Sequence, residues 1–175
     1  VGFFEENTYN AVLDLAVELP KEKPEEIAIV KSLLSAVSSS PYAVLEVIEK
    51  NRTYFEKFYM DDVLSNVTNW KLAFDTEIKT INRVVDYVDD FNSKFARIVD
   101  YIDQEDTSCE SKFIIFTGFV STAIKLEECF KNFFGERTTC SFHTGKSPEE
   151  MQDAATLFQN DNECRFMICD ESGGE

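Results

Sequence analysis

The chain has 175 residues, 43% of them hydrophobic and sixteen of them phenylalanine, which is enough to build a core without disulfides or a structural metal. Its formal net charge of -16 excludes indiscriminate adsorption to nucleic acid or to anionic membranes, because such binding depends on clustered Lys and Arg. Any contact with nucleic acid must therefore be local.

Cysteine usage and hydropathy indicate the compartment. The five cysteines, at positions 109, 129, 140, 164 and 169, form no Cys-x-x-Cys pair, so reduced intracellular thiols are expected. With a single histidine in the chain, a zinc site is not expected. No apolar run reaches the roughly 18 residues that cross a bilayer, and the first residues lack the features of a secretory signal. The sequence predicts a soluble, cytoplasmic protein without membrane contact.

The first part of the chain, residues 1–107, is predicted to be an all-helical arm. No glycine occurs between Gly2 and Gly118, so few special backbone angles are needed. Helices are predicted over 9–19, 24–37 and 41–60, with proline near the first turn of the last two. Two amphipathic stretches follow: Ile81, Val84, Val85, Val88 and Phe91 in one, and Phe95, Ile98, Val99 and Ile102 in the other, after the cap Asn92-Ser93. These apolar stripes indicate core packing.

The second part, residues 108–175, alternates strands with helices. Apolar runs rich in β-branched and aromatic residues predict strands over 112–117, 138–142 and 164–169. Between them lie a helix over 120–134, ending at Gly135, and a helix that begins at the cap Ser147, with Pro148 and Glu150 in its first turn, and runs to about Asn160. This order predicts an α/β fold with a parallel sheet and right-handed crossovers.

Glycines follow all three predicted strands. Gly118 follows the first, Gly145 the second, and Gly173-Gly174 the third. Because ligands of open parallel sheets bind outside the carboxyl ends of the strands, these turns favour a backbone that approaches phosphate closely. Simple tight turns are the alternative interpretation. Lys146, beside a helix start, suits a phosphate oxygen or is a solvated surface lysine.

Two segments imitate the nucleotide site of a P-loop protein. Residues 144–147 resemble the end of a Walker A loop, and residues 166–171 resemble a Walker B strand. The Walker A pattern requires a glycine five positions before Gly145, where Cys140 stands inside a predicted strand. A self-contained ATP site is therefore disfavoured.

Two other catalytic arrangements are also disfavoured. A Cys140 nucleophile with His143 as its base requires an electropositive setting that this acidic chain does not offer. Asp170 and Glu171 are adjacent on a strand, so their side chains point to opposite faces and do not share a proton. The sequence therefore predicts no catalytic residue.

Three segments of the second part resemble a known family: Lys112–Phe119, Phe142–Gly145 and Arg165–Glu175. They are similar to the C-terminal RecA-like lobe of superfamily-two, Swi/Snf-type helicase-like ATPases, and most to the bacterial branch that contains the RNA-polymerase-recycling ATPase. There they form motif IV, the loop after the next strand, and the start of motif V. The resemblance covers about residues 95–175. Upstream, Leu33–Lys50 is similar to the helical stretch between the lobes of bacterial members.

The resemblance implies that the parent protein is an ATP-binding, nucleotide-hydrolysing motor that moves along DNA or RNA, with RNA polymerase or another protein as partner. Carried over by matching position, the residues facing the nucleic-acid backbone would be Gly118, Phe119, His143, Thr144, Gly145 and Lys146. The motif V residues Ser172, Gly173, Gly174 and Glu175 would link that surface to the nucleotide cleft. Such contacts position phosphate and read no bases.

The family's Walker A loop, Asp-Glu box and arginine-bearing motif VI do not occur in these residues, which stop within motif V. ATP and Mg are therefore expected to bind only in the parent protein. Because phosphoryl transfer needs both lobes, we expect this chain alone neither to hydrolyse ATP nor to bind DNA tightly. Two alternatives stay open: a helix-rich protein-interaction module with a small α/β scaffold, and a self-contained P-loop NTPase.

Overall fold

The computed structural model describes residues 2–81, 94–106 and 110–171. Contacts divide the chain into two compact units, Val1–Thr76 and Glu77–Glu175, whereas the sequence placed the boundary between residues 107 and 108. Several predicted features lie outside the described residues: Val84, Val85, Val88 and Phe91 of the first amphipathic stretch, the cap Asn92-Ser93, and the motif V residues Ser172, Gly173, Gly174 and Glu175.

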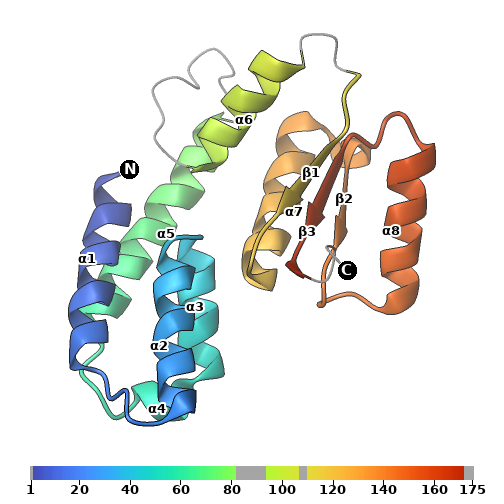
Figure 1. Ribbon diagram of the computed structural model, residues 1–175. Coiled ribbons are helices and arrows are strands. Elements are labelled where there is room, and N and C mark those ends of the chain that lie inside the picture. The colour runs from blue at the N-terminus through green and yellow to red at the C-terminus, as the bar shows by residue number, and fades with distance from the viewer. Residues whose placement is uncertain (1, 82–93, 107–109, 172–175) are drawn as a thin grey trace. The chain divides into compact units, whose positions relative to one another are not determined.

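The first unit is helical, as predicted (Figure 1). Its elements are α1 (Phe3–Glu18), α2 (Pro24–Val37), α3 (Pro41–Lys50), α4 (Arg52–Phe55) and the greater part of α5 (Asp61–Ile81). Fully buried side chains from all five helices form the core: Val12, Leu33, Val37, Val44, Phe55 and Val67. Such burial supplies most of the stability of helices of this length.

The helix boundaries in this unit follow local capping chemistry. Helix α2 has the predicted bounds, and α3 begins with Pro41 in its first turn and the Ser40 hydroxyl accepting the N–H of Ala43 at 3.1 Å. The predicted single helix over 41–60 is wrong, because α3 stops at Lys50. Asn51 leaves the helical region (φ -118°) and its side chain donates to the carbonyl of Val47 at 2.9 Å, a local bond that competes with helix continuation. Helix α5 was not singled out.

The second unit combines helices with a small parallel sheet (Figure 1). Its elements are α6 (Lys94–Glu105), β1 (Phe113–Phe116), α7 (Val120–Phe134), the short 3-10 helix η2 (Glu136–Thr138), β2 (Thr139–Phe142), α8 (Pro148–Asn160) and β3 (Phe166–Cys169). Both strand pairs are parallel, and the order is β1-β3-β2. The predicted α/β class, with three parallel strands alternating with two helices, is confirmed.

The ends of α7 and α8 have the predicted caps. Ser147 accepts the N–H of Glu150 at 3.2 Å, and the Glu150 carboxylate accepts the N–H of Ser147 at 2.8 Å, which is a capping box. Gly135 follows α7 with φ of 111°, an angle that favours glycine. These two signals fixed the helix bounds correctly from the sequence.

The helices α7 and α8 cover opposite faces of the sheet. The ring of Phe166 lies 5.1 Å from that of Phe130 and 4.5 Å from that of Phe134, both on α7. The next residue, Met167, packs against the cluster around Cys140, Ala154 and Cys164 on the α8 side. Alternation along β3 thus supplies both cores, which is the layering of a doubly wound fold.

Helix α6 packs with the sheet unit, although the sequence assigned it to the arm. The Phe95 ring lies 5.7 Å from that of Phe130 on α7. At the other end of α6, Asp106 forms an ion pair with Arg165 at the start of β3 and accepts the N–H of Ser111 at 3.2 Å. The Asp106 side chain is 1% exposed. This arrangement explains why the contacts divide the chain before α6. None of the described helices has the length and apolar content of a membrane span.

Candidate site at the carboxyl edge of the sheet

The turns after β1, β2 and β3 lie together at one edge of the sheet. A methyl group placed on Gly118, after β1, would lie 3.8 Å from Glu171 Oε1, after β3. A methyl group on Gly145, after β2, would lie 3.2 Å from Val120 at the start of α7. Two of the three predicted glycine turns therefore share one edge, because parallel strands end on the same side.

The turn after β2 is fastened to the end of β3 by Asp170. Its Oδ2 accepts the backbone N–H of Thr144 at 2.8 Å and the Thr144 hydroxyl at 2.7 Å. Asp170 is buried, whereas Thr144 and Glu171 are exposed. Both residues lie beyond β3, which ends at Cys169, and the buried Asp170 holds the turn after β2 in place.

His143 lies beneath this turn. Its side chain is 3% exposed, and its Nδ1 accepts the N–H of Gly145 at 3.1 Å. Burial, and next the charge of Lys146, lowers the pKa of the imidazole. Because Nδ1 accepts the N–H of Gly145, the neutral form of the ring carries its proton on Nε2. His143 shapes the turn from inside, and its predicted contact with a nucleic-acid backbone stays a prediction.

Lys146 points toward Glu127 on α7. The Lys146 Nζ lies 3.6 Å from Glu127 Oε1, and the same carboxylate binds Lys131 at 2.8 Å and accepts the hydroxyl of Ser141. Burial opposes ionisation of Glu127, but the hydrogen bonds from Lys131 and Ser141 and the charge of Lys146 hold its pKa below the ordinary value. A phosphate contact by Lys146 would have to compete with this carboxylate.

Phe119 and the start of α7 form the least acidic part of the edge. Phe119 is the N-cap of α7, has no side-chain capping bond, and no acidic residue follows it in the first turn. Helix α8 differs, because its first turn contains Glu149 and Glu150 and Ser147 caps it. The dipole of a helix N-terminus favours anions, so the start of α7 is the better place for a phosphate.

The position of Cys140 fits neither a phosphate-binding loop nor a catalytic nucleophile. It lies within β2, so no phosphate-wrapping loop forms between residues 140 and 147. Its Sγ donates to the carbonyl of Ala154 at 3.5 Å, and burial raises the pKa of the thiol to about 12. A protonated, buried thiol is unreactive. Within the described residues, no group of three potential ligands that could hold a metal is present.

Sequence reasoning missed Glu127, and it did not pair Asp170 with Thr144. Glu127 lies in the middle of a predicted helix, four residues before Lys131. This spacing is typical of an exposed ion pair on a helix surface. Nothing in the sequence brings it to Lys146, because that contact depends on how α7 crosses to β2. Nothing in the sequence paired Thr144 with Asp170, because the two residues are 26 positions apart.

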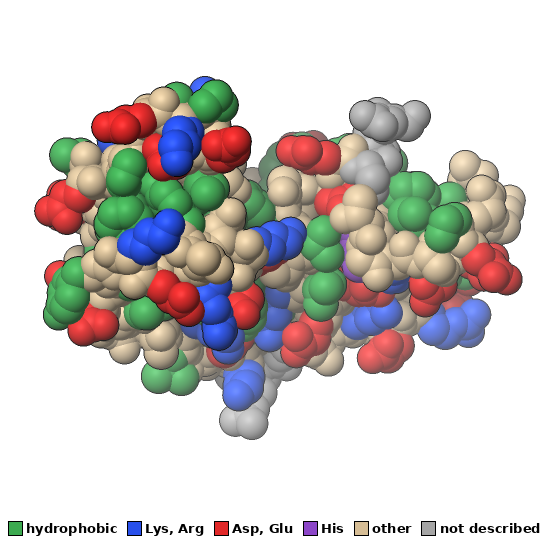
Figure 2. Space-filling model, turned by 90° about the horizontal axis from the view of Figure 1, so that it is seen from below, with side chains coloured by type: hydrophobic (Ala, Val, Ile, Leu, Met, Phe, Trp, Pro, Cys, Tyr) green, Lys and Arg blue, Asp and Glu red, His purple; other side chains and the backbone are tan. Residues whose placement is uncertain are grey.

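Charge is mixed over the face shown in Figure 2, where acidic and basic side chains lie side by side. No family model matches this chain, and no curated protein and no solved structure shows significant similarity to it. The family resemblance of the three segments therefore remains a hypothesis.

Proposed function

We propose that the second unit is a RecA-like lobe of a nucleic-acid-stimulated ATPase motor, and that its sheet edge contacts the phosphate backbone of DNA or RNA. The observation that carries the proposal is the convergence of the turns at Gly118, Thr144–Gly145 and Glu171 on one edge of a parallel sheet. This is where such sheets bind ligands. The resemblance of the three sequence segments supports the same assignment.

The start of α7 supplies the anion-binding groups of this surface, because the N–H groups of Thr144 and Gly145 already donate to Asp170 and to His143. Gly118, Thr144 and Gly145 are exposed, and the first turn of α7 has no acidic residue. Glu171 opposes a phosphate beside Gly118, so the preferred position is between Phe119 and the Gly145 turn. These groups read no base edges, so we propose binding without sequence preference.

ATP and Mg belong to the complete two-lobed protein in this proposal. The described residues include no phosphate loop, and the Asp170 carboxylate is already bound by Thr144. The residues of this unit that the structure describes therefore do not form a nucleotide site on their own. ATP hydrolysis between this lobe and the opposite one would drive movement, while this edge would hold the strand.

The test uses amide chemical shifts of the labelled chain titrated with a short oligothymidylate at low salt. We expect weak binding, with shifts at Gly118, Phe119, Thr144, Gly145 and Lys146 that disappear as salt is added. Lys146→Ala should reduce the salt slope by about 1. The matched control is Lys50→Ala, which removes an exposed lysine of the first unit and should change nothing.

Two results would contradict the proposal. Shifts confined to the first unit would move any nucleic-acid contact away from the sheet edge. Micromolar binding of Mg-ATP by the chain, measured by calorimetry, would favour the self-contained P-loop NTPase instead.

A second candidate, a protein-interaction module, is favoured for the first unit by one observation. Tyr9, Leu13 and Val17 follow each other at four-residue intervals on α1 and are exposed, Val17 by 78%. Such a row on one helix face is typical of a surface that meets another protein. Cosedimentation with RNA polymerase tests it: Val17→Glu should abolish binding, and Lys21→Glu, beyond the end of α1, should not.

A further inference from the structure

Strand β1 has the composition of a central strand but an edge position. Its four residues, Phe113 to Phe116, are all apolar, as is typical of strands buried on both faces. In the described part of the chain, however, β1 pairs only with β3. Ile114 is 48% exposed and Phe116 is 58% exposed. Edge strands are usually short, charged or covered, and β1 carries no charge.

The outer side of β1 presents backbone groups for a further strand. The N–H of Phe113 donates to Arg165 at 2.7 Å, and the N–H of Thr117 donates to Cys169 at 2.9 Å, both toward β3. Because neighbouring residues of a strand alternate in direction, the N–H and C=O of Ile114 and Phe116 point the other way. They face the outer side of β1.

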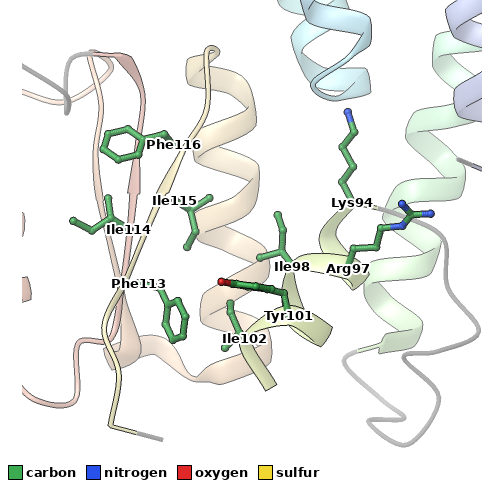
Figure 3. A pocket seen from close by; sticks show the side chains of 9 residues that line it. All are labelled: Lys94, Arg97, Ile98, Tyr101, Ile102, Phe113, Ile114, Ile115 and Phe116. Atoms are coloured by element: carbon green, nitrogen blue, oxygen red, sulfur yellow. The ribbon is translucent and has the colours of Figure 1, made fainter. Parts of the chain in front are cut away.

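A groove of about 550 Å³ runs along β1, with α6 as its other wall. Figure 3 shows Phe113 and Ile115 pointing toward α6, and Ile114 and Phe116 pointing to the opposite face of the strand. Helix α6 contributes Ile98, Tyr101 and Ile102 to the lining. A strand laid against β1 would therefore cover apolar side chains on both of its faces.

The charge of the groove is basic and lies at one end. Its charged lining residues are Lys94 and Arg97, both exposed and both on the first turn of α6. In Figure 3 they lie beyond Ile98, away from Tyr101 and Ile102. In a chain with a net charge of -16, the exposed guanidinium of Arg97 beside an apolar groove favours a carboxylate on the bound segment.

We propose that the edge of β1 and this groove bind an extended segment of a partner protein, in which apolar residues alternate and an acidic residue lies beside Arg97. Addition of a strand to a sheet edge gives affinity through backbone hydrogen bonds and specificity through side-chain pockets. A second copy of this chain fits less well, because Lys112 directly flanks its β1 and offsets the charge of the carboxylate nearest to the start of that strand, Glu110.

The probe is a blocked peptide of alternating valine and threonine with an aspartate at each end, and the control peptide carries lysine in place of aspartate. We expect the aspartate peptide to bind the chain and to slow hydrogen exchange at the amides of Ile114 and Phe116. Arg97→Glu should weaken this binding at least about fivefold, since it reverses the charge that faces the aspartate. Fluorescence anisotropy gives the affinities.

A second variant tests the backbone contact. Ile114→Pro removes an outward N–H at a position where an edge strand tolerates proline, and it should abolish peptide binding. The matched control is Ile124→Ser, which removes a similarly exposed apolar side chain on α7 (52% exposed) outside the groove. If Ile114→Pro does not fold, the exchange protection in the unmodified chain and the effect of Arg97→Glu still test whether the peptide binds at β1.

Several outcomes would overturn the proposal. Equal affinity for the aspartate and lysine peptides would remove the role of Arg97. Exchange protection elsewhere would remove the role of β1. Slow exchange of Ile114 and Phe116 without peptide would show that the edge is already paired within the chain. If that protection rises with protein concentration, a second copy is the occupant. None of these results bears on phosphate binding at the carboxyl edge.

Discussion

Thr144 donates twice to Asp170, through its backbone N–H at 2.8 Å and through its hydroxyl at 2.7 Å. The pair joins the turn after β2 to the end of β3, so the position of the exposed Gly145 turn depends on a buried carboxylate. A hydrogen bond to an ionised, buried acceptor is among the stronger ones in proteins. This contact therefore holds the geometry of the candidate site.

Replacing Thr144 by valine removes the hydroxyl without changing the shape of the side chain. We expect Thr144→Val to lower the free energy of unfolding by about 1–3 kcal/mol, because Asp170 loses a donor in a buried setting. The matched control is Thr156→Val on α8, where the exposed hydroxyl donates to the carbonyl of Gln152 at 2.8 Å and accepts the side-chain amide of Gln152 at 3.5 Å. Urea denaturation measures both, and equal losses would contradict the special role of Asp170.

The two glycines of the site should respond differently to alanine. A methyl group on Gly145 would lie 2.9 Å from His143 Nδ1 and 3.2 Å from Val120, whereas on Gly118 it would meet Glu171 at an ordinary 3.8 Å. We expect Gly145→Ala to destabilise the chain by about 1–3 kcal/mol, because it overpacks a buried ring. Gly118→Ala should cost less than about 0.5 kcal/mol. Thermal unfolding compares the stability of the two variants. Equal stability of Gly145→Ala and the unmodified chain would contradict the prediction, because it would show that the turn shifts without cost.

The titration of His143 should contribute to the pH dependence of the free energy of unfolding. Burial, then Lys146, lowers the pKa of His143 below its ordinary value of 6.5. On acidification the unfolded chain binds this proton first, so stability falls as pH drops from about 6.5 toward the folded pKa, by at most about 1.4 kcal/mol per pH unit. Above about pH 6.5 the histidine contributes no slope.

His143→Asn tests this contribution, because asparagine offers Gly145 an acceptor that does not titrate. The slope of unfolding free energy between about pH 5 and 6.5 should be smaller in the variant, by denaturant titration at each pH. Carboxylates titrate in both proteins and serve as the internal control. Identical slopes would mean that His143 is protonated as readily in the folded chain as in the unfolded one.

The buried thiols should resist alkylation. Burial raises the pKa of Cys140 to about 12 and also raises the pKa values of Cys164 and Cys169. At about pH 8 these groups are protonated, and iodoacetamide should modify them only after unfolding. Mass spectrometry of digested protein, with the urea-unfolded chain as the control, locates the label. Native labelling of Cys140 at the rate of a free cysteine would contradict its burial.

The regular elements of the second unit could be predicted because their signals are local. Ser147 and Glu150 mark the start of α8, Gly135 marks the end of α7, and apolar runs mark the strands. In the first unit, the sequence did not predict the end of the helix before Asn51. The apolar pattern continues past this residue, but its side chain bonds to the carbonyl of Val47 and competes with helix continuation. The sequence also assigned α6 to the arm, since its apolar face does not specify its partner.

At the candidate site, chain order was sufficient to predict that the turns after parallel strands share an edge, because crossover connections return every strand in the same direction. Chain order did not reveal that Asp170 binds Thr144, that Glu127 meets Lys146, or that β1 ends the described sheet with its apolar residues exposed. These contacts join residues far apart in the chain. Periodicity fixes which face of an element is apolar, but only packing in three dimensions decides what that face meets.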